Sequence, residues 1–94
     1  MSRLAWSSSF RRAFKRRVRK SKVLEQRIFE VLHQLAEDPF LPALRSHKLS
    51  GNLEGLWACW VEYDCRIIFA FAQDPEYGEQ VIVLIDIGSH DEVY

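Results

Sequence analysis

The sequence predicts an α+β domain in which two helices pack on one face of a curved antiparallel sheet. Two segments with apolar residues at helical spacing lie between residues 7 and 38, and three strand-like segments follow between residues 56 and 87. A short strand-like segment precedes the helices, which gives the order β-α-α-β-β-β. Helices gathered on one face of an antiparallel sheet are typical of this order. Because 94 residues suffice for one hydrophobic core, we expect a single domain over residues 1–94.

The first helix is predicted to follow a short strand at residues 4–6, which we expect to pair within the sheet. The serines at residues 7–9 offer an N-cap, because a serine side chain accepts a hydrogen bond from the first turn of a helix. Phe10, Phe14 and Val18 recur every four residues and therefore form one apolar stripe.

The second helix is predicted for about residues 22–37, with Ser21 as a new cap. Its apolar residues fall on one face at helical spacing, namely Leu24, Ile28, Val31, Leu32 and Leu35. The helix is expected to end at Asp38-Pro39, because the residue before a proline avoids the helical region. Two amphipathic helices joined this tightly indicate an antiparallel helical hairpin.

A loop over residues 39–55, with two prolines and two glycines, separates the helices from the strands. The predicted strands comprise residues 56–61, 65–71 and 81–87, joined by turns near 63–64 and across 73–80. The third strand is continuously apolar, which is typical of a strand covered on both faces. The core candidates are Phe10, Phe14, Leu24, Ile28, Leu32, Ile67, Phe69, Val83 and Ile85.

The formal net charge is zero, but the charges are segregated along the chain. Residues 1–27 carry a net charge of +9 and residues 28–94 a net charge of −9. A run of cations is often only a solvated helix face, but eight cations within residues 11–22 repel one another unless a partner neutralises them. We therefore expect contact with nucleic acid or another acidic partner, through Arg11, Arg12, Lys15, Arg16, Arg19 and Lys20.

Several classes of protein are disfavoured. No apolar run is long enough to span a membrane and no signal-peptide pattern is present, so we expect a cytoplasmic protein. Cys59 and Cys65 flank the predicted hairpin turn; a disulfide between them stays open, but free thiols are favoured in a reducing compartment. The sequence shows no zinc-ligand spacing, no nucleotide-binding glycine loop and no nucleophile elbow, and we predict neither metal nor cofactor.

Titratable side chains gather at the predicted strand ends and in the loops beside them. They are His47, Lys48, Asp64, Arg66, His90 and Tyr94. Histidine exchanges protons near neutral pH, and an arginine fork stabilises charge on a phosphate, so this set is suited to phosphodiester cleavage. A structural alternative stays open: Asp64 caps the turn, Arg66 pairs with Glu62, and Tyr94 only packs. His33, inside the second helix, is interpreted as a surface residue.

Four motifs follow one another along nearly the whole chain. They are Trp6-Ser7 with Phe10 and the cationic helix, then Ser46–Gly51, Val61–Phe69 and Gly88–Tyr94. In this order and spacing they resemble the RelE/ParE toxin superfamily, and within it the YafQ-like toxins of type II toxin–antitoxin modules. The resemblance implies a ribosome-dependent endoribonuclease, an mRNA interferase, that enters the vacant A site and cuts mRNA by metal-independent attack of a ribose 2′-hydroxyl.

The resemblance also implies partners and roles. The partners are the ribosome with its mRNA and ribosomal RNA, and a cognate antitoxin protein, through which alone the toxin would meet operator DNA. By position, His47 matches the histidine in the loop before the hairpin, Asp64 the hairpin carboxylate, and His90 the histidine after the last strand. Arg66 matches the strand arginine of RelE-like toxins, and Tyr94 stands where YafQ-like toxins have a terminal aromatic residue.

Trp60 departs from the family pattern, because a second YafQ histidine aligns with it. Tryptophan cannot transfer a proton, but it can stack on a base. A two-residue hairpin turn would place Trp60 opposite Ile67, and a three-residue turn would place it opposite Arg66. Either catalysis rests on His47, Asp64 and His90, or activity is reduced.

Two other interpretations fit the same fold. One is a non-enzymatic toxin of the ParE kind that inhibits DNA gyrase by binding, although two loop histidines favour the nuclease. The other is a degenerate toxin that only binds its antitoxin.

Overall fold

Two serine side chains start the long helices at the predicted places. The computed structural model describes residues 1–94, and its two long helices are α1 at Ser8–Val18 and α2 at Lys22–Glu37. Ser7 Oγ accepts a hydrogen bond of 3.1 Å from the Phe10 N–H, and Ser21 Oγ accepts one of 3.1 Å from the Leu24 N–H. Local capping chemistry therefore determines where both helices begin.

The strands form one five-stranded sheet in the order β1-β5-β4-β3-β2. They are β1 at Arg3–Trp6, β2 at His47–Lys48, β3 at Trp57–Glu62, β4 at Cys65–Gln73 and β5 at Gln80–Gly88. The three predicted C-terminal strands are antiparallel, as expected. However, β1 pairs with β5 in parallel, so the sheet is mixed and the prediction of a wholly antiparallel sheet was wrong for this strand. No tight hairpin joins β1 to β5, and only such a turn would require antiparallel pairing.

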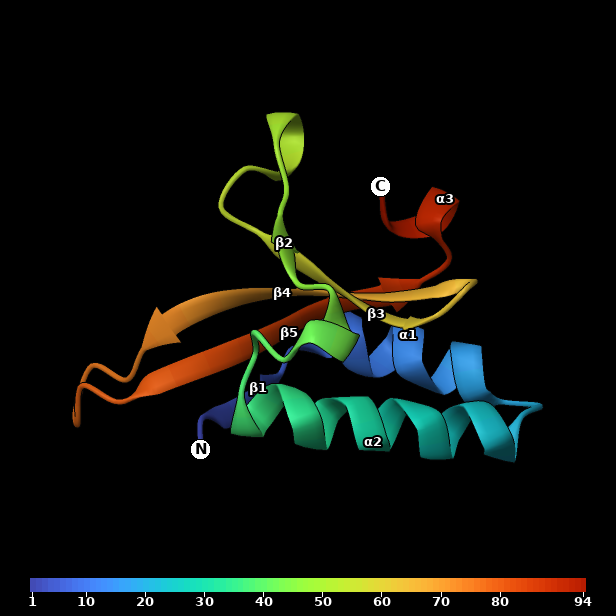
Figure 1. Cartoon of the computed structure of the whole chain (residues 1–94), viewed down its shortest axis with the longest axis horizontal. Coiled ribbons are helices and arrows are strands. Elements are labelled where there is room, and N and C mark those ends of the chain that lie inside the picture. Colours follow the sequence, from blue (N-terminus) through green and yellow to red (C-terminus); the bar gives the residue numbers. More distant parts are fainter.

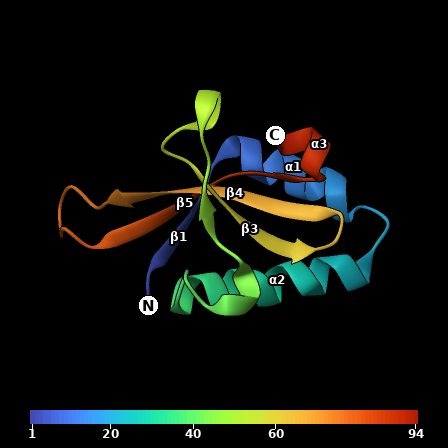
Figure 2. The same ribbon diagram turned by 45° about the horizontal axis from the view of Figure 1, so that its top comes forward.

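Both long helices lie on one face of the sheet, as Figure 1 shows. The segment around β2 and a short C-terminal helix, α3 at His90–Val93, stand on the other face (Figures 1 and 2). The predicted loop of residues 39–55 contains β2 and two single 3₁₀ turns, Pro42–Leu44 and Gly51–Leu53. Neither β2 nor α3 was predicted, because both are too short to show a periodic pattern.

The main core lies between the helices and the sheet. Of the predicted core residues, six are buried in it and Leu24 packs against it partly exposed. Val83 and Ile85 were predicted wrongly: their neighbours Ile82 and Leu84 are fully buried instead, and Ile85 packs on the opposite face. The continuous apolar run of β5 hides which alternate residues face the helices. A bulge between Ile68 and Phe69 in the β4–β5 pairing also shifts the register near Ile85.

The segregation of charge in the sequence becomes a segregation in space. The junction of α1 and α2 carries Arg19, Lys20 and Lys22, and the turn between β4 and β5 carries Asp74, Glu76 and Glu79. These two ends lie at opposite extremes of the long axis, which measures 39 Å (Figure 1). No helix combines the length and the apolar composition that crossing a bilayer requires.

Candidate functional site

The turn between β3 and β4 determines which side chains face α3. Only Tyr63 and Asp64 lie between the strands, but a bulge between Trp60 and Glu62 adds one residue to β3. Trp60 therefore lies opposite Arg66, although the turn itself is the two-residue kind. Paired residues of an antiparallel ladder project to the same face, so Trp60 and Arg66 share the face on which α3 stands.

The helix α3 is held by a capping box at its first turn. The Ser89 N–H donates to Glu92 Oε1 at 2.7 Å, and the Glu92 N–H donates to Ser89 Oγ at 3.3 Å. Val93 is buried against Ala58 and Ile68 of the sheet. The short helix is thereby held against the strands, with His90 as its first residue and Tyr94 directly after its last.

Three of the predicted residues line one open depression of about 680 Å³, namely Asp64, Arg66 and His90. Arg17, Tyr63, Ser89, Asp91 and Glu92 complete its wall. The Tyr94 ring stands edge-on to the His90 ring, with 4.4 Å between centroids. The turn, β4 and α3 thus bring a carboxylate, a guanidinium, an imidazole and a phenol to one place. Sequence spacing alone did not show that Arg17 and Glu92 belong to it.

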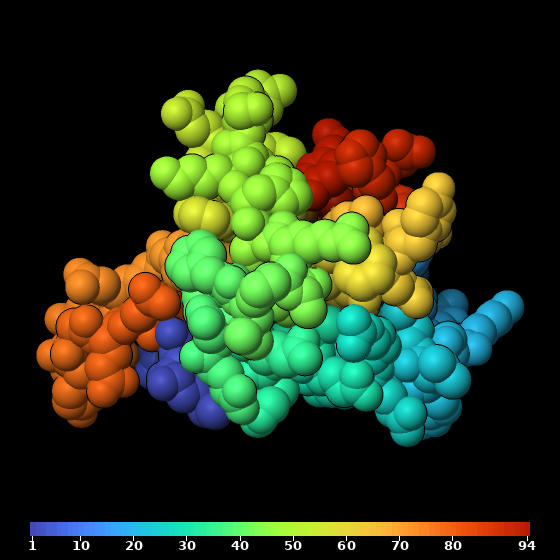
Figure 3. Space-filling model, in the orientation of Figure 1, coloured from blue at the N-terminus to red at the C-terminus, as the bar shows by residue number.

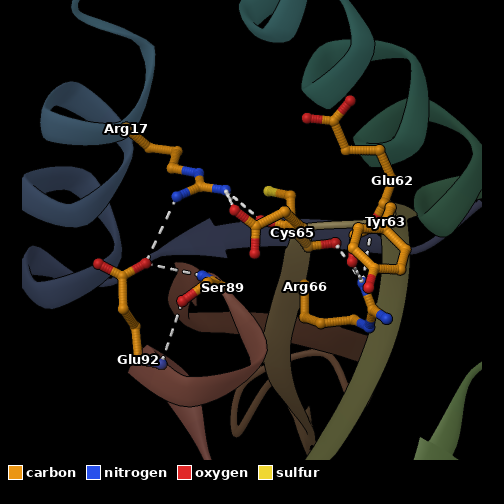
Figure 4. Close-up of polar contacts among 8 residues, drawn as sticks. Arg17, Glu62, Tyr63, Cys65, Arg66, Ser89 and Glu92 are labelled. Carbon is orange, nitrogen blue, oxygen red and sulfur yellow. Dashed lines mark hydrogen bonds and ion pairs between the residues drawn. The ribbon is translucent and has the colours of Figure 1, made fainter.

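Arg66 is anchored by its own turn. Its Nη1 donates to the carbonyl oxygens of Glu62, Tyr63 and Cys65 at 2.6, 3.1 and 3.2 Å (Figure 4). The suggested ion pair with the Glu62 carboxylate does not form, since Arg66 contacts the backbone of that residue instead. Nη1 therefore donates all the hydrogen bonds that anchor this side chain. Nε and Nη2 of Arg66 donate no hydrogen bond to the protein.

The proposed proton carriers are accessible. The side chains of His90 and Asp64 are 67% and 69% exposed, and the nearest partner of the His90 ring is Asp91 Oδ1, at 3.7 Å from Nδ1. Partial burial raises the pKa of Tyr94, although the nearby Arg66 cation opposes this shift. The phenol therefore stays protonated at neutral pH and can donate a hydrogen bond.

His47 and Lys48 do not line the depression. His47 pairs with Ala58 on β3, and its exposed ring bonds through Nδ1 to the Arg45 carbonyl at 3.0 Å. His47 lies level with Ile68 of β4, two strands away, and Arg66 lies two residues further along β4. On a flat sheet this places the Cα atoms of His47 and Arg66 about 12 Å apart. Lys48 faces the other way, with Nζ 5.8 Å from the centroid of the Trp57 ring. The group of titratable side chains that the fold brings together is therefore smaller than the sequence suggested, because His47 and Lys48 lie outside it.

Trp60 carries a partner that the sequence did not predict. The Arg45 guanidinium lies over the indole, 4.9 Å from its centroid, in the geometry of a cation–π contact. Arg45 adopts a left-handed backbone conformation with φ of 51°, which ends the preceding 3₁₀ turn. Arg45, Trp60 and Arg66 thus follow one another across the sheet, from the β2 side toward the depression.

The cationic helix adjoins the same site. The six predicted contact residues of α1 and its end, Arg11, Arg12, Lys15, Arg16, Arg19 and Lys20, are all exposed. Arg16 and Arg17 share a smaller hollow with Asp86 and Glu92, next to the depression. The basic surface of α1 is therefore continuous with the wall formed by α3.

The two cysteines belong to the core and not to the site. Both are buried free thiols, and no disulfide joins them. Burial raises the pKa of Cys59 to about 12 and that of Cys65 to about 11, the latter against the opposing effect of Arg17. Histidine, cysteine and acidic side chains nowhere form a group of three that could bind a metal ion.

Residues 2–94 match the family model described as "Bacterial toxin of type II toxin-antitoxin system, YafQ". No curated protein matches by sequence. Among solved structures, YafQ from Escherichia coli BL21(DE3) superposes with a TM-score of 0.80 at 14% identity, over 100% of this chain and 99% of that one.

Two further structures share this fold. The E. coli DinJ–YafQ complex matches with a TM-score of 0.77 at 18% identity, over 100% of this chain and 99% of that chain. A YoeB/ParE toxin from Agrobacterium tumefaciens matches with a TM-score of 0.77 at 17% identity, over 94% of this chain and 98% of that one. At these identities the likeness establishes the fold alone.

Proposed function

This chain belongs to the YafQ family of bacterial toxins of type II toxin–antitoxin systems, and from that premise we propose that it is a ribosome-dependent endoribonuclease that cleaves mRNA in the A site. The observation that carries the proposal is that Asp64, Arg66 and His90 line one depression, with Tyr94 packed against His90. Asp64 comes from the β3–β4 turn, Arg66 from β4, and His90 and Tyr94 from the C-terminal segment that contains α3.

We assign the chemistry to attack by a ribose 2′-hydroxyl. One accessible group removes the hydroxyl proton, either His90 or Asp64 in the depression or His47, which lies outside it. The 2′-oxygen then bonds to phosphorus while the bond from phosphorus to the 5′-oxygen breaks, and a second group gives the leaving oxygen a proton. The unpaired donors of Arg66 stabilise the charge on the phosphate oxygens, and these side chains act without a metal ion. The Tyr94 ring offers its exposed part for stacking on a base.

The RNA surface in this proposal extends from the depression in two directions. The exposed cations of α1 contact ribosomal RNA phosphates on one side. On the other side, Trp60 and the Arg45 guanidinium above it provide flat surfaces on which a base can stack. Figure 3 shows the projecting residues around β2 and the helix α3 standing next to one another above the sheet, where the mRNA would lie. Lys48 would reach RNA only on the opposite face of β2.

The proposal is tested by mRNA cleavage on programmed ribosomes. We expect His90→Ala to reduce the cleavage rate by about 10²- to 10⁴-fold, the usual contribution of a proton-transferring side chain. The matched control is His33→Ala, because His33 is an exposed histidine on α2 that is engaged only with Glu37, at 2.8 Å, and should leave cleavage unchanged. Full cleavage by His90→Ala would contradict the catalytic assignment. Inhibition of gyrase supercoiling without any mRNA cleavage would instead support a non-enzymatic toxin.

We further propose a cognate antitoxin as the protein partner, because the solved E. coli YafQ structures include its complex with DinJ. Expression of this chain alone should arrest bacterial growth, and co-expression with the antitoxin should restore it. Harmless expression of the chain alone would support a degenerate toxin.

A further inference from the structure

Arg17 is the one cation of α1 that turns inward. It lies three residues after Phe14 and four after Ala13, both of which are buried, so helical spacing places it on the same side of α1. Its side chain is only 22% exposed, whereas Arg11, Arg16 and the other cations of the helix are exposed. Arg17 therefore does not belong to the outer basic surface.

The Arg17 guanidinium joins three segments that are distant in the sequence. Its Nη2 donates to the Asp64 carbonyl oxygen and lies 3.5 Å from the Asp64 carboxylate, and its Nη1 lies 3.4 Å from Glu92 Oε1. Figure 4 shows this guanidinium between Glu92 on one side and the turn beside Cys65 on the other. The helix α1, the β3–β4 turn and α3 thus meet at one side chain.

The helix α3 depends on such contacts. A four-residue helix has no stability of its own, because nucleating a helix is unfavourable and a single turn gains few hydrogen bonds in return. Its docking rests on the Ser89–Glu92 capping box, on buried Val93 and on Arg17. Glu92 Oε1 accepts from both the Ser89 N–H and Arg17, so the capping box and the arginine contact share one oxygen atom.

We infer that Arg17 is a positioning residue, which fixes α3 against the β3–β4 turn and so sets His90 and Tyr94 relative to Asp64 and Arg66. The catalytic consequence of this inference rests on the proposed function, whereas the position of α3 does not depend on that function. A misplacement of about 1 Å in a catalytic group can lower a rate by roughly 100-fold. Arg17 itself touches no substrate atom in this assignment, although its Nη2 lies 3.5 Å from the carboxylate of Asp64, a candidate proton acceptor.

The structural part is tested on the free full-length protein. Backbone order parameters from ¹⁵N relaxation report whether residues 90–94 are held, with about 0.85 for rigid backbone and below about 0.6 for flexible backbone. We expect Arg17→Met to lower the values of residues 90–94 into the flexible range, while those of β4 stay unchanged. The control Arg16→Met removes the same charge from the exposed side of α1 and should leave residues 90–94 rigid. Rigid residues 90–94 in Arg17→Met would overturn the inference, whatever the activity.

The catalytic part is tested by separating kcat from KM in mRNA cleavage on programmed ribosomes. We expect Arg17→Met to lower kcat at least about 10-fold with little change in KM, because the reacting groups lose their arrangement. Arg17→Lys, which keeps the charge but replaces the planar fork by a single ammonium group, should recover only part of kcat. Arg16→Met should raise KM without lowering kcat. If kcat of Arg17→Met equals that of the wild type, the positioning role is wrong.

A second variant separates the charge contact from the cap. Glu92→Gln keeps an N3 side chain that can cap Ser89 but removes the negative charge that faces Arg17. We expect the double variant to lose less kcat than the product of the two single-variant fold losses, because Arg17→Met and Glu92→Gln remove the same contact. Losses that simply multiply would refute coupling through this pair. If the wild-type protein cleaves no RNA, the proposed function fails, while the relaxation experiment still decides the position of α3.

Discussion

The close approach of Gly88 to α3 yields the most sharply defined prediction. Gly88 is the last residue of β5 and pairs with Arg66. A Cβ atom there would lie 2.9 Å from Glu92 Oε1, 3.2 Å from Glu92 Cβ and 3.3 Å from Val93 Cγ1. Carbon atoms pack at about 3.5–4.0 Å, so Gly88→Ala must displace α3 by a few tenths of an ångström or expel the Glu92 carboxylate.

The free-energy cost of this displacement comes from the interactions that the Glu92 carboxylate loses. Expelling it breaks the capping-box hydrogen bond from the Ser89 N–H and the contact with Arg17. A lost cap costs about 1 kcal/mol, and a partly exposed ion pair adds at most about 1 kcal/mol more. A total of about 1–2 kcal/mol lowers the ratio of docked to undocked α3 by roughly 5- to 30-fold. Because α3 lies at the edge of the fold, this opening is local and leaves the core intact.

The assay compares mRNA cleavage with global stability. We expect Gly88→Ala to cleave mRNA on programmed ribosomes more slowly, by at most about 30-fold, while the free energy of unfolding in urea falls by no more than about 2 kcal/mol. As a control, Gly88→Ala should cost less activity in Glu92→Ala than in the wild type, because the carboxylate oxygen at 2.9 Å is gone and only the contacts with the Cβ of residue 92 and with Val93 Cγ1 remain. Wild-type cleavage by Gly88→Ala, with residues 90–94 still rigid, would refute the argument from these contact distances.

Further predictions concern the core, the thiols and the basic surface. Phe10 is fully buried and stands edge-on to Trp6 at 5.0 Å, so Phe10→Ala should reduce the free energy of unfolding in urea by about 3–5 kcal/mol; a loss below 1 kcal/mol would contradict this packing. The pKa values of Cys59 and Cys65, raised from an ordinary 9.0 to about 12 and 11, keep both thiols neutral at pH 8, and iodoacetamide should modify them only on unfolding. Since the unfolded chain loses these protons first, stability should fall as the pH rises above 9, and equal decline in a variant without cysteines would exclude this cause. Replacing three exposed cations of α1 by methionine should flatten the salt dependence of ribosome binding by about 0.7–0.9 in logarithmic slope per lost phosphate contact, and an unchanged slope would show that this surface does not contact RNA.

Local chemistry made the helices predictable from sequence. Ser7 and Ser21 act as the caps that their positions suggested, and α2 ends at Glu37, directly before Asp38-Pro39. The end of the sequence also contained a usable signal that was missed, because Ser89 with Glu92 three residues later is a capping-box pattern. The helix α3 was therefore predictable, although it is only four residues long.

Long-range pairing was less accessible. The parallel partner of β1 lies almost eighty residues away, and no turn in the sequence specifies it. Val83 and Ile85 were wrongly predicted to face the main core. An unbroken apolar run lacks the alternation of apolar and polar residues that would show which side chains face it. The facing of Trp60 depended on a bulge, which inserts one residue without a sequence signal that distinguishes it from a longer turn.

The candidate site was predictable in part. The sequence placed Asp64, Arg66, His90 and Tyr94 at strand ends, and the fold brings these ends together. His47 was included because it was placed in a loop beside the strand ends, whereas its pairing with β3 holds it outside the depression. Arg17 was not singled out within its cationic run, although its spacing from Phe14 and Ala13 indicated an inward face.

The opposite charges at the two ends of the long axis give the molecule a large electric dipole moment. At physiological ionic strength the screening length is about 8 Å, much shorter than the 39 Å that spans the molecule. An RNA surface therefore senses only the end that arrives first. The cationic junction of α1 and α2 is attracted on approach, whereas the acidic turn between β4 and β5 is repelled before contact. We expect the charge distribution to act as a filter on encounters, which discards wrongly oriented collisions instead of rotating the protein from a distance.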